Sequence, residues 1–255
     1  MASLLKYNGS KWILMPWIVE HFPEHKTYVD LFGGSGAAIL RKPRSKFEYF
    51  NDVDDEVVNF FECLQRFEND LIRKIELTPY SDVVYRKSFE IADGSIERAW
   101  AFYVRCWMGQ GNNISTEKGF RLKGNVGSHG GYNPAKLWAD TTNLRFAAER
   151  FKGVTITNMD YRDLLDRLAY KDVLVYADPP YSGDTRAGKM YKHEMMDQRA
   201  HTELIKALEN HPGPVILSGY DNPLYQEALK DWERFEKASR TNSRASKQEI
   251  IWRKM

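Results

Sequence analysis

The sequence predicts an α/β protein in which helices flank a mixed, largely parallel sheet and an inserted, mainly helical lobe interrupts the chain. Short apolar runs rich in β-branched residues alternate with helical patterns, which is typical of parallel sheets. One of these runs leads directly into the glycine turn 33–36, and residues 71–108 carry helical patterns without a strand pattern. A chain of 255 residues is long enough for one such domain with an insertion.

The composition narrows the classes of protein. Hydrophobic residues make up 42% of the chain and charged residues 28%, which argues against wholesale disorder. A net charge of +2 does not by itself indicate a nucleic-acid binder. With two cysteines and no apolar run of membrane-spanning length, we expect a soluble, intracellular, cytoplasmic protein with free buried thiols and no membrane partner. The six histidines lack the spacing of a metal site, so no metal is expected.

Near the beginning of the chain, Asn8-Gly9 marks a turn, and Ser10 is suited to cap a helix over residues 11–21. Lys11 would then lie in the first turn, where the positive end of the helix dipole disfavours a cation. Lys11 is therefore either an ordinary surface lysine or a lysine that meets an anionic or polar ligand.

Residues 27–32 form the first predicted buried strand, which runs into Gly33-Gly34-Ser35-Gly36 and then into a helix of small residues. A strand, a glycine turn and a helix start together allow a ligand to approach the backbone closely. The turn lacks the six-position dinucleotide fingerprint and the Gly-Lys-Ser/Thr ending of a phosphate loop. Asp30, just before the turn, either reaches a ligand amine or bonds the backbone of the loop.

Residues 47–50 are the second predicted strand, and Asp52 stands at its tip. An acid about twenty residues after a glycine turn is the usual acceptor for ribose hydroxyls. The alternative is that Asp52 or Asp54 caps the predicted helix 55–67. Both roles can coexist, with Asp54 capping and Asp52 binding, and the glycine turn together with Asp52 favours a nucleoside-type ligand.

The inserted lobe begins with helices that are broken at Thr78-Pro79 and Asp93-Gly94. A glycine-rich basic stretch follows over residues 109–134, with a hairpin expected over 114–125. Such a loop either contacts nucleic acid or is an irregular surface loop. A helix is predicted over residues 134–151 because Pro134 suits a first helical turn.

The third strand is predicted over residues 154–158, and Asp160 after it either accepts from an adenine amino group or caps the helix 161–169. The strand 172–177 then ends abruptly in Asp178-Pro179-Pro180-Tyr181. In an open α/β sheet, ligands bind at this edge. Asp178 and the Pro179 carbonyl can both accept hydrogen bonds from one amino group, and Tyr181 can stack on the ring that carries it. The alternative is a plain strand followed by a Pro-Pro turn.

The remaining elements follow in order. We expect a lid over residues 182–196, an amphipathic helix over 197–210, a strand over 214–217, a helix over 223–231 and a closing strand pair over 235–238 and 249–253. Basic residues gather between residues 234 and 254, as they do between 105 and 136, and each group is either a nucleic-acid contact or a solvated basic face.

Taken in order, these motifs resemble the Dam-type family of S-adenosylmethionine-dependent DNA adenine-N6 methyltransferases. The segments that carry the resemblance are Asn8-Gly9-Ser10-Lys11-Trp12, Asp30 to Gly36, Asn51-Asp52, the Asp-Pro-Pro-Tyr motif 178–181 and Glu249-Ile250-Ile251-Trp252. They span nearly the whole chain. The match is weakest between about residues 71 and 137, where the glycine-rich stretch 124–131 departs from the family pattern, and this leaves the recognised DNA sequence open.

The resemblance implies a Rossmann-like methyltransferase fold, with a catalytic domain in residues 1–68 and 150–255 and a target-recognition lobe in residues 69–149. It implies methyl transfer from S-adenosylmethionine to the N6 amino group of an adenine flipped out of double-stranded DNA, without a metal. We expect a monomer or weak dimer, and restriction–modification is one biological role open to it. The resemblance places the following residues in the site: Asp178, Pro179, Pro180 and Tyr181 as catalytic; Tyr7, Lys11, Asp30, Phe32, Gly33, Gly34, Ser35, Gly36, Asp52, Asp160, Tyr161 and Asp178 as cofactor-binding; Arg105, Lys118, Arg121, Lys123, Asn242 and Arg244 as DNA-binding.

Three other interpretations compete with this one. A related enzyme could methylate RNA or the N4 amino group of cytosine, and Asp rather than Ser or Asn at position 178 favours adenine in DNA by family analogy. A nucleotide-binding oxidoreductase would use the glycine turn, but the full fingerprint is missing. A catalytically silent DNA-binding module would bind the cofactor without transfer, and the intact motif 178–181 argues against it.

Overall fold

The computed structural model describes residues 3–7, 9–111, 114, 116–117, 119–122, 133–180, 195, 197–239 and 247–255. Over these residues the chain forms a sheet of seven strands in the order β3-β2-β1-β4-β5-β7-β6. The strands are β1 (Thr27–Asp30), β2 (Phe47–Asn51), β3 (Thr155–Thr157), β4 (Val173–Ala177), β5 (Val215–Gly219), β6 (Glu233–Ser239) and β7 (Lys247–Lys254). A mixed, largely parallel sheet flanked by helices was the predicted class, and it is confirmed.

The first five strands run parallel, and β7 runs against them. In the centre, Val29 of β1 pairs with Tyr49 of β2 on one side and with Val175 of β4 on the other. β7 is antiparallel to both β5 and β6 and lies between them. The carboxyl ends of β1, β2, β4 and β5 therefore share one edge of the sheet, and β7 begins at that same edge.

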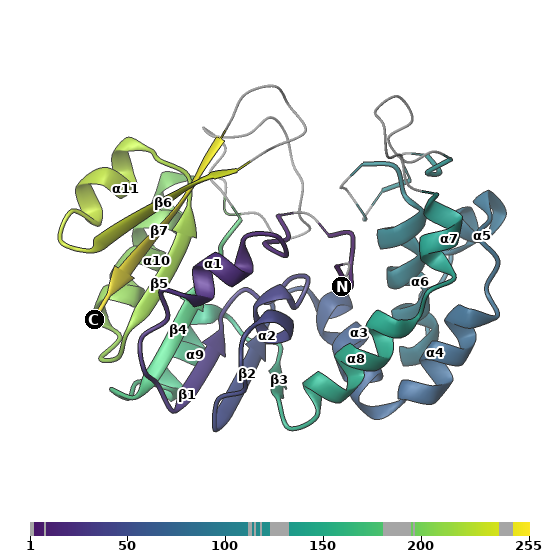
Figure 1. The fold of residues 1–255 in the computed structure, drawn as a ribbon, viewed down its shortest axis with the longest axis horizontal. Coiled ribbons are helices and arrows are strands. Elements are labelled where there is room, and N and C mark those ends of the chain that lie inside the picture. Colours follow the sequence, from purple (N-terminus) through teal and green to yellow (C-terminus); the bar gives the residue numbers. More distant parts are fainter. Residues whose placement is uncertain are drawn as a thin grey trace.

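Helices cover both faces of the sheet (Figure 1). The helices are α1 (Met15–Val19), α2 (Ala37–Arg41), α3 (Asp55–Arg66), α4 (Glu68–Glu76), α5 (Asp82–Lys87), α6 (Ser95–Met108), α7 (Pro134–Trp138), α8 (Thr142–Phe151), α9 (Tyr161–Arg167), α10 (Gln198–Asn210) and α11 (Pro223–Ala228). Because strand side chains alternate between faces, Tyr176 packs with α1 and α2 on one face, and its neighbour Val175 packs with α9 and α10 on the other.

The helices α3 to α8 pack side by side at the β3 edge of the sheet (Figure 1). Aromatic rings join them, with Phe60 stacked on Tyr103 at 5.8 Å and Phe61 stacked on Phe151 at 4.4 Å. Their buried residues belong to the same hydrophobic cluster as Tyr28 and Tyr176 of the sheet. The predicted helical insert thus shares its core with one face of the sheet.

Some predicted boundaries were wrong. The first helix begins at Met15 rather than at residue 11, because the Ser10 hydroxyl bonds the Ser35 hydroxyl at 2.8 Å instead of capping a helix. The predicted helix 134–151 is two helices: α7 ends at Trp138 and α8 begins at Thr142, and in the turn between them the Asp140 carboxylate accepts the backbone N–H of Thr142 at 3.0 Å. Of the predicted hairpin over 114–125, residues 114, 116–117 and 119–122 are described, and Phe120 forms a bridge with Gly109. Of the predicted lid over 182–196, residue 195 is the one described, so the lid stays a prediction.

The amino end of β2 carries a buried ionic cluster, which we call the scaffold cluster: Lys42, Glu48 and Arg150. The Lys42 ammonium lies 2.6 Å from Glu48 Oε1, and Arg150 donates to both oxygens of Glu48 at 2.6 and 2.8 Å. Burial opposes ionisation of Glu48, but these hydrogen bonds outweigh it and lower the pKa of Glu48 to about 2. The cluster joins β2 to α8, which lie far apart in the sequence.

Two further expectations concern the whole chain. Cys63 and Cys106 are free and buried, as expected. Within the described ranges, no helix is both long enough and apolar enough to cross a membrane.

Candidate active site

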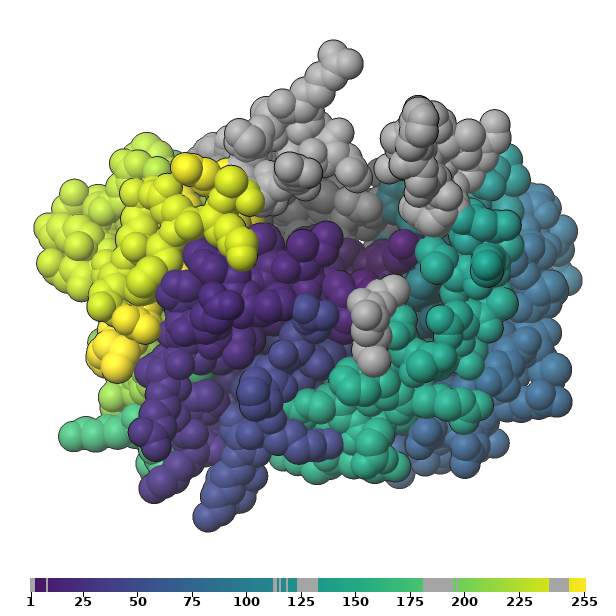
Figure 2. All heavy atoms as spheres, in the orientation of Figure 1, coloured from purple at the N-terminus to yellow at the C-terminus, as the bar shows by residue number. Residues whose placement is uncertain are grey.

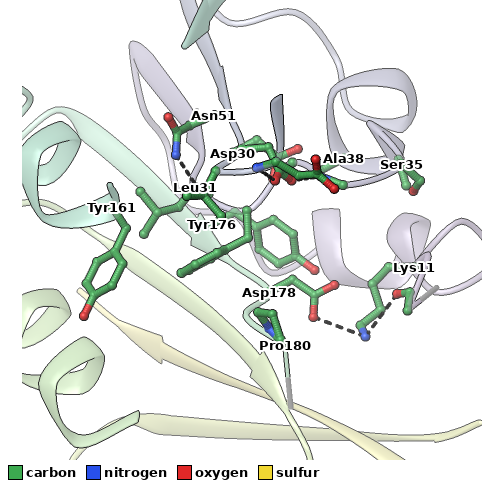
Figure 3. Close-up of a pocket in the computed structure, with 18 of the residues that line it drawn as sticks. Lys11, Asp30, Leu31, Ser35, Ala38, Asn51, Tyr161, Tyr176, Asp178 and Pro180 are labelled. Carbon is green, nitrogen blue, oxygen red and sulfur yellow. Dashed lines mark hydrogen bonds and ion pairs between the residues drawn. The ribbon is translucent and has the colours of Figure 1, made fainter. Parts of the chain in front are cut away.

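A cavity of about 260 Å³ opens at the shared carboxyl edge of the parallel strands (Figure 3). Strand tips supply its carboxylates: Asp30 ends β1, Asp52 follows β2 and Asp178 follows β4. The glycine turn 33–36 and Tyr161 at the start of α9 also line it. Parallel pairing explains this convergence, because it brings the ends of separate strands to one edge.

The segment before α1 forms part of the wall. In Figure 2 the earliest residues of the chain lie across the front of the molecule, between the C-terminal strand pair and the helices at the β3 edge. Tyr7, Ser10 and Lys11 line the cavity, and the Tyr7 ring lies against the turn at Gly34. The bond between Ser10 and Ser35 ties this segment to the glycine turn.

The glycine turn is shaped by packing as well as by its place beside the cavity. A Cβ atom on Gly33 would lie 2.2 Å from the Phe50 ring, so no larger residue fits there. Gly34 has a φ of 48°, which favours glycine, and its backbone N–H donates to Asp52 Oδ2 at 2.8 Å. The turn therefore packs on β2 and is bonded to the acid that follows β2.

The prediction that Asp54 caps a helix is confirmed, and binding of a ligand by Asp52 stays a prediction. Asp54 accepts the N–H of Glu56 at 3.1 Å and caps α3. Asp52 lines the cavity and accepts backbone N–H groups from Gly34 and Asp54, the latter at 2.9 Å. Burial nevertheless dominates and raises the pKa of Asp52 to about 6.

Asp30 is a buried carboxylate with an unused oxygen. It is 1% exposed, and its Oδ2 has no hydrogen-bond partner within the described part of the chain. Burial, followed by the nearby charges of Asp178 and Asp52, raises the pKa of Asp30 well above its usual range. An unsatisfied buried acceptor beside a cavity fits a cationic or hydrogen-donating ligand group.

Lys11 joins two carboxylates that sequence reasoning did not connect. Its ammonium lies 3.2 Å from Asp178 Oδ1 and 3.1 Å from Glu249 Oε1. Figure 3 shows Lys11 pointing towards Asp178. Glu249 is 2% exposed, although it lies in a strand whose next three residues are apolar. An acid in a buried strand was the sequence signal for this missed residue.

A buried hydrogen bond joins β4 to β5 just before Asp178. The Tyr176 hydroxyl lies 3.0 Å from the Ser218 hydroxyl of β5, in the core beneath the tip. Asp178 and Pro180 line the cavity. Tyr181 lies outside the described residues, so its predicted stacking role stays a prediction.

Aromatic side chains form another part of the cavity wall. The rings of Phe32 and Tyr161 lie 5.9 Å apart, and the Arg162 guanidinium covers the Tyr161 ring at 4.7 Å. Asp160 accepts the backbone N–H of Arg162 at 2.9 Å, so it caps α9, and it also lines the cavity. The capping alternative for Asp160 is thus realised, and contact with an adenine stays a prediction.

The residues predicted to bind DNA are placed less clearly. Arg105 is held by Glu56 at 2.6 Å with its side chain 14% exposed, and Arg121 donates to the Gly109 carbonyl at 2.8 and 3.1 Å. Both guanidinium groups therefore have structural partners. Four further predicted residues lie outside the described ranges: Lys118, Lys123, Asn242 and Arg244. No group of His, Cys, Asp and Glu side chains suited to a metal ion occurs among the residues that the structure describes.

Comparisons with known proteins point in the same direction as this geometry. A family model described as D12 class N6 adenine-specific DNA methyltransferase matches residues 7–243. A DNA adenine methylase from Vibrio cholerae is 24% identical over 95% of this chain and 90% of its own length. One from Escherichia coli is 24% identical over 88% of this chain and 83% of its own length.

Among solved structures, a SAM-dependent methyltransferase from Agrobacterium tumefaciens gives a TM-score of 0.40 at 11% identity, over 95% of this chain and 59% of that chain. A conserved hypothetical protein from Streptococcus pyogenes gives a TM-score of 0.41 at 12% identity, over 95% and 94%. Structural similarity this low does not indicate a shared function.

Proposed function

The chain belongs to the D12 class N6 adenine-specific DNA methyltransferase family, and on that premise we propose which residues carry out the methylation of DNA adenine and how. We propose that the methyl donor is S-adenosylmethionine and that the acceptor is the N6 amino group of an adenine flipped out of duplex DNA. One observation carries the proposal: Asp178 stands at the carboxyl end of β4 in the same cavity as the glycine turn and Asp52.

The residues of the cavity fit the proposed donor. The unused oxygen of Asp30 suits an ammonium group, and the carboxylate of Asp52 suits ribose hydroxyls. The rings of Phe32 and Tyr161 offer flat apolar surface for a base. When bound, S-adenosylmethionine supplies an electrophilic methyl group, and the protein's task is to bind and orient it.

Asp178 acts on the acceptor in this proposal. The adenine amino nitrogen is a weak nucleophile, since its lone pair is delocalised into the ring. A hydrogen bond from this amino group to Asp178, and a second to the Pro179 carbonyl, favour a pyramidal nitrogen whose lone pair is available. Positioning and charge stabilisation then carry the rate, and Lys11 holds the Asp178 carboxylate in place at 3.2 Å.

The base must leave the duplex for this to happen, because its amino group is not accessible in line within stacked DNA. We propose that residues 69–149 form the lobe that recognises the target site and that Tyr181 stacks on the extruded base. Arg121 is one of the basic residues proposed to lie near the DNA backbone. The recognised sequence is set by contacts of this lobe rather than by the cavity.

The test is transfer of labelled methyl from S-adenosylmethionine to unmethylated duplex DNA, followed by nucleoside analysis of the digest. We expect the label in N6-methyladenine, and mapping of its positions would give the recognised sequence. Label in N4-methylcytosine would keep the donor site and overturn the assignment of the base. Binding of the donor without transfer to DNA, together with transfer to RNA or to nothing, would overturn the proposed substrate.

A further inference from the structure

Glu249 is a charged residue in a place where a charge is costly. It lies in β7, is 2% exposed, and is followed by Ile250, Ile251 and Trp252, which are also buried. Burying an ionised carboxylate is costly unless a partner compensates its charge. Its oxygen lies 3.1 Å from the Lys11 ammonium, which supplies such a partner.

Lys11 is shared between this carboxylate and the one in the proposed reaction. The ammonium group has three donors and contacts Asp178 and Glu249 at nearly equal distances, 3.2 and 3.1 Å. One cation thus lies between two carboxylates, of which Glu249 is the more deeply buried and Asp178 lines the cavity. The Glu249 carboxylate thus competes with Asp178 for the Lys11 ammonium group and helps to set the direction of its N–H donors.

Strand topology explains how residues so far apart in the sequence meet. Gly219 of β5 pairs with Ile250 of β7, so Glu249 lies one residue further towards the carboxyl edge of β5. Alternation along β7 puts Glu249 on the face of Ile251, which shares a hydrophobic cluster with Tyr176. Lys11 reaches that face from the segment before α1.

We infer that Glu249 is a positioning residue for the methyl transfer, acting on Asp178 through Lys11; this inference rests on the proposed function. Without Glu249, the ammonium group would turn fully to Asp178 and occupy acceptor positions that the amino group needs. With Glu249, the lysine divides its donors between two carboxylates and holds Asp178 in one orientation. Glu249 touches neither substrate in this scheme.

The first measurement compares Glu249→Gln with the wild-type protein in single-turnover transfer and in binding of S-adenosylhomocysteine. Glutamine keeps the shape and removes the charge. We expect the transfer rate to fall about ten- to a hundredfold, as a small misplacement of a reacting group does. The dissociation constant should change by less than about threefold, since the donor pocket is retained. Glu249→Asp keeps the charge and should recover most of the rate.

A matched control comes from the same strand pair. Glu233 in β6 pairs with Arg253 of β7 at 2.6 Å, but its side chain is 54% exposed. Glu233→Gln should leave the single-turnover rate unchanged. A wild-type rate in Glu249→Gln, or an equal loss in both variants, would overturn the inference.

A double-mutant cycle with Lys11→Met tests whether Glu249 acts through the lysine. If it does, adding Glu249→Gln to Lys11→Met should cause little further loss of rate. Losses that multiply would overturn the inference. The double variant removes both charges of the Lys11–Glu249 pair, so it stays measurable if Glu249→Gln alone folds poorly. A wild-type protein that does not methylate DNA would instead refute the proposed function, which separates the two failures.

Discussion

Two buried lysines meet carboxylates at opposite ends of the same sheet. In the scaffold cluster, Lys42 and Arg150 surround one carboxylate, Glu48, and all three are closed in by protein. At the cavity, one lysine, Lys11, lies between two carboxylates, Asp178 and Glu249. The same type of contact thus joins distant elements at one end of the sheet, and at the other end it holds a carboxylate, Asp178, that lines the cavity.

The carboxylates of the two regions also differ in how strongly they hold protons. Hydrogen bonds from Arg150 and Lys42 lower the pKa of Glu48 to about 2. Burial raises the pKa of Asp52 to about 6 and that of Asp30 well above its usual range. A buried carboxylate whose partners are all protein stabilises the fold, whereas one that is buried without full compensation is suited to a ligand.

The largest expected effect is on activity: a change at Asp178 in the cavity should lower the transfer rate without lowering the stability of the fold. Asp178→Ala should lower the rate of methyl transfer by at least about a thousandfold, as loss of a preorganised charge-stabilising group does. Lys11 keeps Glu249 as a partner, so the melting temperature and donor binding should stay close to those of the wild type. Single-turnover kinetics and calorimetry measure both quantities. A rate within about tenfold of the wild type would remove Asp178 from the mechanism.

A change in the scaffold cluster should instead lower the stability of the fold and leave the transfer rate unchanged. Glu48→Gln leaves two buried cations without their carboxylate, which should lower the free energy of unfolding by about 3–5 kcal/mol. The transfer rate per folded molecule should not change. Urea denaturation gives the free energy of unfolding, and active-site titration combined with kinetics gives the transfer rate per folded molecule. Glu68→Gln is a surface control, since Glu68 faces Lys152 at 3.8 Å, and it should cost no more than about 1 kcal/mol.

As the pH falls, donor binding in the cavity should weaken before the scaffold cluster loses its stabilising effect. Because the pKa of Asp52 in the folded protein is raised to about 6, this group gains its proton as the pH falls through 6, and it then accepts hydrogen bonds poorly. Donor affinity should therefore fall several-fold between about pH 7.5 and 5.5. Calorimetric titration with S-adenosylhomocysteine measures this, and Asp52→Asn should bind more weakly at every pH with a flatter dependence. An unchanged slope in that variant would assign the titration to another group.

The scaffold responds to acid over a different range. The folded pKa of Glu48 is about 2, below its usual value of 4.5, so its stabilising effect is present above pH 4.5 and is lost as the pH falls towards 2. Circular dichroism at about pH 5.5 should therefore show a folded protein, while calorimetric titration at the same pH should already show weaker binding of the donor. If donor binding and the fold were lost at the same pH, the predicted difference between the cavity and the scaffold cluster would be wrong.

The smallest effect should come from the edge of the scaffold cluster. The His25 ring lies 2.8 Å from the Ser45 hydroxyl, which also accepts from Lys42. Burial lowers the pKa of His25, so the folded state favours the neutral ring, and stability should fall as the pH drops below 6.5. His25→Gln should cost on the order of 1 kcal/mol, like the loss of one hydrogen bond, and should remove this part of the pH dependence. Denaturation at about pH 7.5 and 5.5 tests it.

Sequence reasoning found the parts of the site that are encoded locally. The strand before Asp178, the glycine turn and the acid Asp52 can be read within short windows, because each is a strand end followed by a turn signal. Parallel pairing then brings such strand ends to one edge, so the location of the cavity could be predicted as well. The capping roles of Asp54 and Asp160 were also readable from their position before a helix.

The parts that were missed depend on tertiary contacts. Lys11 was singled out, but its partner Glu249 lies at the other end of the chain, and no local pattern specifies that pairing. Ser10 was suited to cap a helix, but Ser35 competes for its hydroxyl. Gly33 was interpreted as a place where a ligand approaches the backbone, and its tightest neighbour is the Phe50 ring. The break at residues 139–141 lies inside an otherwise helical pattern, and the Asp140 carboxylate bonds the Thr142 N–H there.

The place of β7 has a consequence for how the protein is made. β7 lies between β5 and β6 in the sheet, although both of those strands precede it in the chain. During translation, β5 and β6 therefore leave the ribosome before the strand that joins them, and the apolar edge of β5 has no partner until then. Lys11 and Asp178 are made before Glu249, so the arrangement around Asp178 is completed only when the final strand emerges. A nascent chain would form the glycine turn 33–36 early and complete the contacts around Asp178 last.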